Sequence, residues 1–421
     1  MRILSIIYES VYGVPTLTLI FSVFLFLNIK TRFIGIRKIS ASIKTVFSRD
    51  KNGNFGSALK SACVSLSATV GTGNIVGVAG AVSLGGAGAV FWMWVSAILS
   101  LSVKYLEIYL SSIYKKDGSA YSYIFKVLNS NALRRVFLVL GIIAAFGIGN
   151  LTQTNAASSS AAVVLREIGI RPDVSGIIVG IVFMLLCIAL LKRESGAIKL
   201  CEILLPFMAA AYIIFCAAAL FVVREKIPDT FSIILKGAFS PKAVTGGMVG
   251  SVIKAMKAGV ARGIFSNEAG LSTAALAYEK STTPPHITAL FGIFEVIVDT
   301  LVLCTLTALV VISSGTVVYG KDLGAYTTMS SFTSILGKNS VFWFCPIICF
   351  FAFSSVIGWG IYARRFSEKL SVNPNLIVLV YSACCILGAV SGAGAVWQIA
   401  EISSILMMTV NCAALILNKY S

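Results

Sequence analysis

The chain has 421 residues, of which 57% are hydrophobic and only 12% charged, and its formal net charge is +17. About a quarter of the residues of a soluble domain are charged, so this composition excludes an ordinary soluble protein and indicates an all-α polytopic membrane protein. The excess of Lys and Arg does not indicate a nucleic-acid partner, because the basic residues lie in short loops between apolar runs rather than on one soluble face.

The apolar runs predict about eleven transmembrane helices, at about 20 residues for each crossing. The first run lacks a strong basic segment before it and a cleavage site of small residues, so we interpret it as a helix and not as a signal peptide. The longest polar connections are residues 30–54, 224–244 and 314–340. The predicted helices are 12–29, 55–83, 89–114, 136–165, 174–191, 198–223, 245–276, 287–313, 341–363, 373–392 and 395–418.

The distribution of basic residues predicts the orientation in the membrane. If the basic connection 30–54 is cytoplasmic, alternation of the helices puts most of the Lys and Arg on the cytoplasmic side. We therefore expect a multi-pass cell-membrane protein with its N-terminus outside and its C-terminus in the cytoplasm. Residues 33–47 mix basic and apolar side chains, which is typical of an amphipathic segment on the anionic leaflet but also fits a solvated loop.

Two of the predicted helices are interrupted by glycine near their middle. The second contains Gly71-Thr-Gly-Asn74, and the seventh contains glycines between Gly259 and Gly270. An unwound helix exposes backbone N–H and C=O groups, which are costly at membrane depth unless a ligand binds them. Close helix packing also uses glycine and is our preferred interpretation of Gly77 and Gly80, but it does not explain polar residues at the breaks.

The two broken helices lie five helices apart in the predicted order, so they cross the membrane in opposite directions. This pattern is typical of a five-plus-five inverted repeat, whose paired broken helices form a binding site near the bilayer midplane. The predicted divisions are an extra helix with its basic loop (1–54), a first repeat (55–223), an extracellular connection (224–244) and a second repeat (245–421).

Several motifs, in this order along nearly the whole chain, closely resemble the alanine or glycine:cation symporter family. The resemblance implies a leucine-transporter-type fold and the uptake of alanine or glycine, coupled to Na⁺ or alternatively to H⁺, by alternating access without a covalent cofactor. We expect a monomer. The motifs are Ala68–Ala79, Phe91–Val95, Lys104–Glu107, Phe146–Asn155, Gly259–Leu271, Phe294–Thr300 and Phe351–Trp359.

The resemblance also implies a substrate site at the first break. Gly71, Thr72 and Gly73 are expected to contact the main-chain groups of the substrate, at a half-helix N-terminus that favours a carboxylate. Asn74 either joins this contact or braces the break through the local backbone.

A polar patch on the fourth predicted helix contributes to the same site. The resemblance implies that Gln153 faces the pocket, although packing between helices is the alternative. Asn155 is a structural candidate in the same patch, and the spacing of Asn150, Gln153 and Thr154 predicts that these three share one face.

The seventh and ninth predicted helices are expected to complete the pocket. By resemblance Phe265 faces the substrate, and Ser266 beside it has a hydroxyl and a carbonyl to offer. Trp359 either closes the pocket or packs in an aromatic core, since both interpretations predict the same residue. Lys254 and Lys257, toward the outer end of the seventh helix, have no role in this scheme.

Five further residues are candidates for structural or gating roles, because ions and amides inside a membrane are expensive unless they have partners or functions. Glu268 either ligates an ion or braces the break by accepting a hydrogen bond from Arg262 or from backbone. Glu295 and Asp299 either relay protons or pair with basic and backbone groups. The five are Arg262, Asn267, Glu268, Glu295 and Asp299.

A cation site is implied next to the first break. A hard cation takes oxygen ligands from hydroxyls and from carbonyls that a broken helix frees. Carried onto this sequence, the fold's Na⁺ site consists of the carbonyls of Ser67 and Val70 and the hydroxyls of Ser354 and Ser355. A serine pair in a helix also fits back-bonding to the helix itself.

An ion channel and a membrane enzyme are the competing classes. A channel is expected to have pore-lining repeats rather than two unlike broken helices. An enzyme needs a nucleophile with a base or a set of metal ligands, but the chain has a single histidine, His286, and ten cysteines in apolar runs without CxxC spacing. With no Walker loop either, we expect a secondary transporter and not an enzyme.

Overall fold

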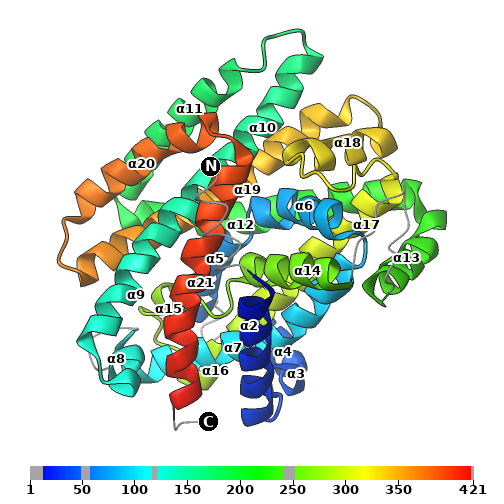
Figure 1. Cartoon of the computed structure of the whole chain (residues 1–421). Coiled ribbons are helices and arrows are strands. Elements are labelled where there is room, and N and C mark those ends of the chain that lie inside the picture. The colour runs from blue at the N-terminus through cyan, green and yellow to red at the C-terminus, as the bar shows by residue number, and fades with distance from the viewer. Residues whose placement is uncertain (1–12, 49–56, 116–120, 240–251, 419–421) are drawn as a thin grey trace.

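The computed structural model describes residues 13–48, 57–115, 121–239 and 252–418. Every regular element within these ranges is helical (Figure 1). Parts of the predicted segments, including residues 49–56 and 245–251, lie outside the described residues.

Each of the eleven predicted apolar runs contains helix in the described chain, so the all-α prediction is confirmed. The second run is divided, as expected, into α5, a short 3-10 turn and α6. The elements up to residue 167 are α2 (Val14–Lys30), α3 (Ile34–Arg37), α4 (Ile39–Phe47), α5 (Ser57–Thr69), η1 (Thr72–Asn74), α6 (Val76–Gly85), α7 (Ala89–Tyr114), α8 (Ser122–Leu128), α9 (Asn131–Ala144), η3 (Ala145–Leu151) and α10 (Thr152–Glu167).

Two π-helical turns, η3 and η5, are continuous with the α-helices on either side of them. The remaining elements are α11 (Val174–Leu191), α12 (Glu194–Val222), η4 (Arg224–Lys226), α13 (Ile227–Phe239), α14 (Val252–Asn267), α15 (Ala274–Ala277), α16 (Pro285–Val296), η5 (Ile297–Cys304), α17 (Thr305–Ser314), α18 (Ala325–Leu336), α19 (Ser340–Lys369), α20 (Pro374–Val390) and α21 (Ala393–Leu417).

Seven helical segments are long and apolar enough to cross a bilayer, and the bent pair formed by α5 and α6 makes an eighth. The other predicted crossings are the shorter helices α2 and α20 and the 16-residue described part of the seventh, α14. Seven or eight crossings therefore follow from length and composition, and the count of eleven stays a prediction.

The three long connections predicted to be polar contain helices within their described parts. α3 and α4 lie in the first, α13 in the second and α18 in the third. α4 is anchored by Ser42, whose hydroxyl donates to the Leu290 carbonyl of α16 at 2.7 Å, while Ile43 and Phe47 remain exposed. Residues 34–37 and 39–47 are thus helical and not irregular loop, because their apolar residues recur at helical spacing, and their position on the anionic leaflet stays a prediction.

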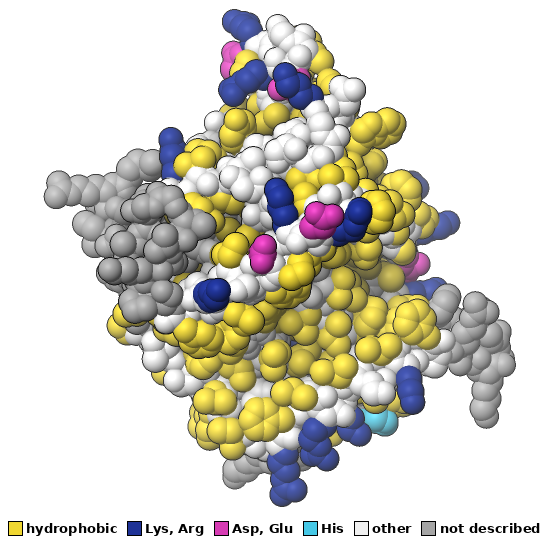
Figure 2. Space-filling view, turned by 90° about the vertical axis from the view of Figure 1, so that its right-hand side faces the viewer, with side chains coloured by type: hydrophobic (Ala, Val, Ile, Leu, Met, Phe, Trp, Pro, Cys, Tyr) yellow, Lys and Arg dark blue, Asp and Glu magenta, His cyan; other side chains and the backbone are white. Residues whose placement is uncertain are grey.

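The helices form one bundle, in which α7 packs against α14 and α16 (Figure 1). α19 packs against α5, α10 and α12, while α21 runs along α9 at the front of the view. Figure 2 shows a broad hydrophobic region on one face, with basic side chains and the single histidine at its lower edge. An apolar exterior of this kind suits a lipid environment.

Candidate functional site

The first broken helix turns sharply at Gly71. The axes of the two halves are bent by 59°. A Cβ atom on Gly71 would press on the Ser355 hydroxyl and would lie 2.8 Å from Gln153 Oε1, which leaves room only for glycine. Asn74 Oδ1 accepts a hydrogen bond from the Gly71 amide at 3.0 Å, so the asparagine side chain closes the turn.

Gln153 from α10 holds the next residue of the break. Its Oε1 accepts from the backbone amide and from the hydroxyl of Thr72, both at 2.9 Å, and its Nε2 donates to the Ile148 carbonyl at 3.0 Å. The Gly73 amide has no hydrogen-bond partner within the described chain, and a Cβ there would lie 3.7 Å from the Phe265 ring. The Gly73 N–H is thus a donor that remains available beneath an aromatic wall.

A buried carboxylate connects the two broken helices. Asn74 Nδ2 donates to Ser266 Oγ at 3.0 Å and to Asp299 Oδ1 at 2.7 Å. Asp299 Oδ2 also accepts from the hydroxyls of Ser266, at 2.5 Å, and Thr300, at 2.8 Å. Asn74 is therefore positioned to brace the break, and Asp299 is positioned as a hydrogen-bond acceptor for both halves of the molecule.

Four neutral oxygens converge beside the first break, two carbonyls from α5 and its end and two hydroxyls from α19. Ser355 Oγ lies 3.2 Å from the Ser67 carbonyl and 3.4 Å from the Val70 carbonyl, and Ser354 Oγ lies 3.4 Å from the Ser67 carbonyl. The two helices approach closely because a Cβ on Gly358 would lie only 2.8 Å from the Ala68 Cα.

These separations suit a shared cation. A hard cation takes oxygen ligands at about 2.4 Å, and two such ligands at a right angle lie ~3.4 Å apart. As hydrogen bonds the same contacts are long compared with the usual 2.7–2.8 Å between oxygens. The chemistry of the set, uncharged hydroxyl and carbonyl oxygen, fits a hard cation and not a soft metal.

The second break lies further along the chain than the glycine pattern predicts. α14 continues through Asn267, and unwinding begins at Glu268, where positive φ angles occur at Glu268, Gly270 and Ser272. Gly259 and Gly263 mark the close crossing with α7 instead, since a Cβ on Gly259 would lie 2.8 Å from the Trp92 Cβ. The predicted interruption of the seventh helix therefore begins near the end of the range 259–270, and Gly259 and Gly263 belong to intact helix.

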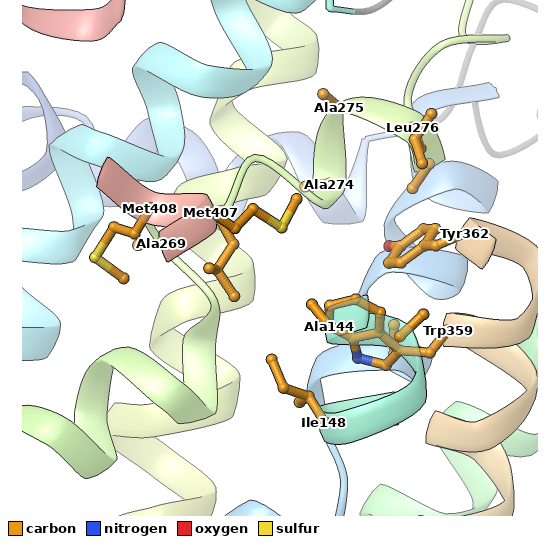
Figure 3. Packing of buried hydrophobic residues seen from close by; sticks show 14 of the residues in the cluster. Ala144, Ile148, Ala269, Ala274, Ala275, Leu276, Trp359, Tyr362, Met407 and Met408 are labelled. Atoms are coloured by element: carbon orange, nitrogen blue, oxygen red, sulfur yellow. The ribbon is translucent and has the colours of Figure 1, made fainter. Parts of the chain in front are cut away.

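Glu268 braces this break. Its Oε1 accepts from Trp359 Nε1 at 2.9 Å and its Oε2 accepts from the Thr273 hydroxyl at 2.6 Å. Figure 3 shows the Trp359 ring beside Ala144 and Ile148, so the tryptophan joins α19 both to the break and to the fourth predicted helix. The bracing interpretation of Glu268 fits this geometry, but its partners are Trp359 and Thr273 and not Arg262.

Two buried charged residues of α7, Lys104 and Glu107, hold the same break although they lie outside the predicted site. Lys104 Nζ donates to the Asn267 carbonyl at 3.0 Å, at the end of α14. Glu107 Oε1 accepts from the Ser272 amide at 3.0 Å and from Asn411 Nδ2 at 2.6 Å. The sequence does contain a signal for these two residues, because a lysine and a glutamate three positions apart are rare inside an apolar helix.

The other polar candidates of this region also have partners. Asn267 Oδ1 accepts from the Ala269 amide at 3.0 Å. Glu295 accepts from the Ser65 hydroxyl at 2.7 Å and from the Tyr278 hydroxyl, and one of its oxygens lies 3.7 Å from Lys104 Nζ. Of the two interpretations of Glu295, pairing with a basic group is the one that this geometry fits.

Asn150 and Thr154 share a face as predicted, since both lie against α20, but the prediction is wrong for Gln153. Asn150 Nδ2 donates to the Tyr381 carbonyl of α20 at 2.6 Å, whereas Gln153 points to the first break. The cause is η3, a π-helical turn with a wider repeat that shifts the register between Asn150 and Gln153. Asn155 also binds α20, through the Ser391 carbonyl at 2.7 Å, away from the break.

Arg262 and Phe265 form a cation–π pair beside the first break, where Arg262 lies against Gly77 and Phe265 lies against Gly73. The guanidinium carbon of Arg262 lies 5.3 Å from the centroid of the Phe265 ring. Arg262 Nη2 is 3.9 Å from Glu401 Oε1 on α21, and both side chains are 10% exposed.

Ion pairs and hydrogen bonds join α15 and the residues just after it, which follow the second break, to α12 and α19. Arg365 of α19 donates from Nη2 and Nε to Glu194 Oε1 at 2.5 and 3.0 Å, and also to the Leu276 carbonyl at the end of α15. Lys369 Nζ lies 2.5 Å from Glu279 Oε1. Charged side chains of α12 and α19 therefore hold α15 and Glu279 in place.

Known proteins resemble the chain over its full length. The model of the sodium:alanine symporter family matches residues 1–420. An uncharacterized transporter of Haemophilus influenzae is 35% identical, over 98% of this chain and 92% of its own length. The sodium/alanine symporter AgcS of Methanococcus maripaludis is 31% identical (99% and 94%), and the probable sodium/glutamine symporter GlnT of Bacillus subtilis is 32% identical (99% and 88%).

Proposed function

Because this chain belongs to the sodium:alanine symporter family, a family of sodium-coupled amino-acid transporters and not of enzymes, we propose that it carries alanine or glycine into the cell together with Na⁺. Relatives named for alanine and for glutamine are almost equally similar to it. The preference for the smallest amino acids therefore has to be argued from the site.

The observation that carries the proposal is that two cation ligands and a substrate donor lie on one continuous stretch of backbone, from the last turn of α5 into the break. The carbonyls of Ser67 and Val70, with the hydroxyls of Ser354 and Ser355, would hold Na⁺. The Gly73 amide follows three residues after Val70 and would bind the carboxylate of the substrate.

The coupling of Na⁺ and substrate binding follows from the fact that both ligands contact one continuous stretch of backbone. A cation that draws the Ser67 and Val70 carbonyls together fixes the backbone at the start of the break, and a substrate on the Gly73 amide needs the same backbone in place. Each ligand therefore lowers the cost of ordering the segment for the other, which is reciprocal linkage between the two sites.

The walls of the site favour a small side chain. Phe265 covers Gly73, Gln153 occupies the Thr72 donors, and Trp359 is fully buried against Glu268. An apolar wall discriminates by about 1–3 kcal/mol for each extra methylene, which gives a preference for alanine and glycine without absolute exclusion of larger substrates. In this scheme Asn74 and Ser266 position the segment through Asp299.

The same proposal includes alternating access in a five-plus-five inverted repeat, with α5–α6 and α14–α15 as the paired broken helices. The ion pairs of Glu194 and Glu279 would open when α15 moves and would release the substrate toward the cytoplasm. The charge bias of the loops supports an outside N-terminus and a cytoplasmic C-terminus. A monomer is sufficient for transport in this scheme, since one chain supplies all the proposed ligands of Na⁺ and of the amino acid.

Purified protein in liposomes tests the proposal. Radiolabelled alanine is offered under an inward Na⁺ gradient or under an inward pH gradient, with glycine and glutamine as competitors. We expect accumulation with the Na⁺ gradient and its loss when a sodium ionophore dissipates that gradient. Accumulation with the pH gradient alone would establish proton coupling instead, and no accumulation under either gradient would refute symport.

A further inference from the structure

The buried charges around the two breaks do not balance. In the part of the chain that the structure describes, Lys104 is the buried cation that lies among four fully buried carboxyl groups, while Arg262 and Arg365 pair with other carboxylates. Uncompensated charge in the interior of a membrane protein is costly, so this excess of negative charge favours a bound proton or a bound metal cation. The four carboxyl groups belong to Glu107, Glu268, Glu295 and Asp299.

The hydrogen-bond donors around these groups distinguish Glu107 from the other three, each of which accepts hydrogen bonds on both oxygens. Oε1 of Glu107 accepts from the Ser272 amide at 3.0 Å and from Asn411 Nδ2 at 2.6 Å. Its Oε2 is buried and has no hydrogen-bond partner among the described residues. An ionised carboxylate needs donors on both oxygens, so these surroundings fit a neutral acid with a proton on Oε2.

The other titratable groups near Glu107 do not supply a counter-charge. Lys104, one turn earlier on α7, instead donates to the Asn267 carbonyl at 3.0 Å and lies 3.7 Å from Glu295. The remaining groups are two phenols and a thiol, which are neutral at neutral pH. They belong to Tyr121 and Tyr123, at the start of α8, and to Cys412 of α21.

Glu107 is part of a ring of hydrogen bonds that holds the second break against α8 and α21. The Tyr123 hydroxyl lies 2.7 Å from Ser272 Oγ and donates to Asn411 Oδ1. Asn411 Nδ2 donates to Glu107 and also to the Gly270 carbonyl, at 2.8 Å. Ser272 and Gly270 have positive φ angles, so the ring binds the residues at which the chain turns after α14. We call Glu107, Tyr123, Ser272 and Asn411 the break ring.

Apolar side chains cover the break ring. A Cβ atom on Gly270 would lie 2.8 Å from Met408 Cγ and 3.2 Å from the Phe24 ring. The Glu107 side chain itself is fully buried. A proton on Oε2 can therefore exchange with water only after the break ring has opened.

Resting on the alternating access of the proposed function, we propose that Glu107 is a proton-binding site whose proton latches the second break in its closed conformation. While Oε2 is protonated, the break ring is neutral and is stable in the apolar interior. When α15 moves, Ser272 leaves the carboxyl group and water reaches it. The O–H bond of Oε2 then breaks, its electron pair stays on the carboxylate, and the proton passes to the water.

The link between proton and conformation is reciprocal. Because the closed break holds the proton more tightly than the open break, a bound proton favours closure and opening releases the proton. Rising pH should therefore favour the open break. Glutamine has an uncharged side chain at every pH, so Glu107→Gln removes this response while it keeps an oxygen acceptor for Ser272 and Asn411.

Infrared spectroscopy of the purified protein tests for the proton directly. A protonated carboxyl group has a carbonyl-stretch band that an ionised carboxylate lacks. The difference spectrum between wild type and Glu107→Gln at neutral pH should contain this band, and Glu107→Asp, which keeps an acid, should show it at a shifted frequency. Glu368→Gln is the matched control, because Glu368 is an exposed carboxylate on α19, and it should leave the band unchanged.

Transport tests the latch. Initial rates of alanine uptake into proteoliposomes are measured under a saturating Na⁺ gradient, with equal pH on both sides of the membrane. Between roughly pH 6 and pH 9 the wild-type rate should rise at least about fivefold. Glu107→Asp and Glu368→Gln should keep this rise, whereas the rate of Glu107→Gln should not change with pH and should stay near the wild-type rate at the lowest pH.

The outcomes separate this inference from the proposed function. A difference spectrum without the acid band would overturn it, and a carboxylate band of Glu107 that shifts with Na⁺ would show a metal cation in place of the proton. A pH profile of Glu107→Gln as steep as that of the wild type would overturn the latch. If the wild type shows no gradient-driven uptake, the proposed function fails and the latch with it, while the infrared band still decides whether Glu107 binds a proton.

Discussion

Ser355→Ala is the sharpest test of the cation site. The Ser355 hydroxyl makes the 3.2 Å approach to the Ser67 carbonyl and the 3.4 Å approach to the Val70 carbonyl, so its removal leaves only Ser354 to complete the set. Loss of a ligand dipole next to a charge costs about 1.5–3 kcal/mol. The Na⁺ concentration for half-maximal uptake should therefore rise about ten- to a hundredfold.

The assay is the initial rate of alanine uptake into proteoliposomes as a function of external Na⁺, at a fixed membrane potential. Ser367→Ala is the matched control, because Ser367 is a buried serine on the same helix whose hydroxyl donates to the Arg364 carbonyl at 2.7 Å. The maximal rate of Ser355→Ala at high Na⁺ should approach that of the control. Equal half-maximal Na⁺ concentrations in the two variants would refute the assignment of these oxygens.

Three other substitutions follow from the same contacts. Gln153→Ala leaves two buried donors of the first break without their acceptor, so alanine uptake should fall at least tenfold in folded protein, as judged by size-exclusion chromatography; normal uptake would remove this residue from the site. Gly71→Ala should abolish uptake, whereas Gly196→Ala, where a Cβ would meet no atom within 4 Å, should leave it unchanged; equal activities would contradict the tight turn. Trp359→Phe removes the hydrogen bond to Glu268 and should destabilise the protein by about 1–3 kcal/mol, measured as a lower Tm in detergent, and an unchanged Tm would show that the bond contributes nothing.

The polar glycine-rich motif of the first break could be interpreted from the sequence alone, because its composition has few other uses inside a membrane. Thr72 and Asn74 combine with glycine at membrane depth, and the structure has its 59° bend there. The four oxygens around Ser67 could be suggested only by resemblance, since the contact between α5 and α19 depends on Gly358, which gives no pairing signal of its own.

Other features depended on geometry that a sequence pattern does not contain. The π-helical turn before Thr152 shifts the register, so α-helical spacing misplaced Asn150 relative to Gln153. Glycine marks both unwinding and close packing, so Gly259 and Gly263 indicated a break where α14 crosses α7. Partners distant in sequence, such as Glu401 for Arg262, became visible only when α14 and α21 were seen together.

Linkage between alanine and Na⁺ binding tests the central claim most directly. Alanine affinity is measured on purified wild-type protein at equilibrium, without a membrane or gradient, in saturating Na⁺ and in choline. Because the Ser67 and Val70 carbonyls and the Gly73 amide belong to one continuous stretch, the last turn of α5 and the break that follows it, Na⁺ should lower the Kd for alanine about five- to 150-fold, and alanine should lower the Kd for Na⁺ by the same factor. Alanine binding of equal affinity in Na⁺ and in choline would contradict the account.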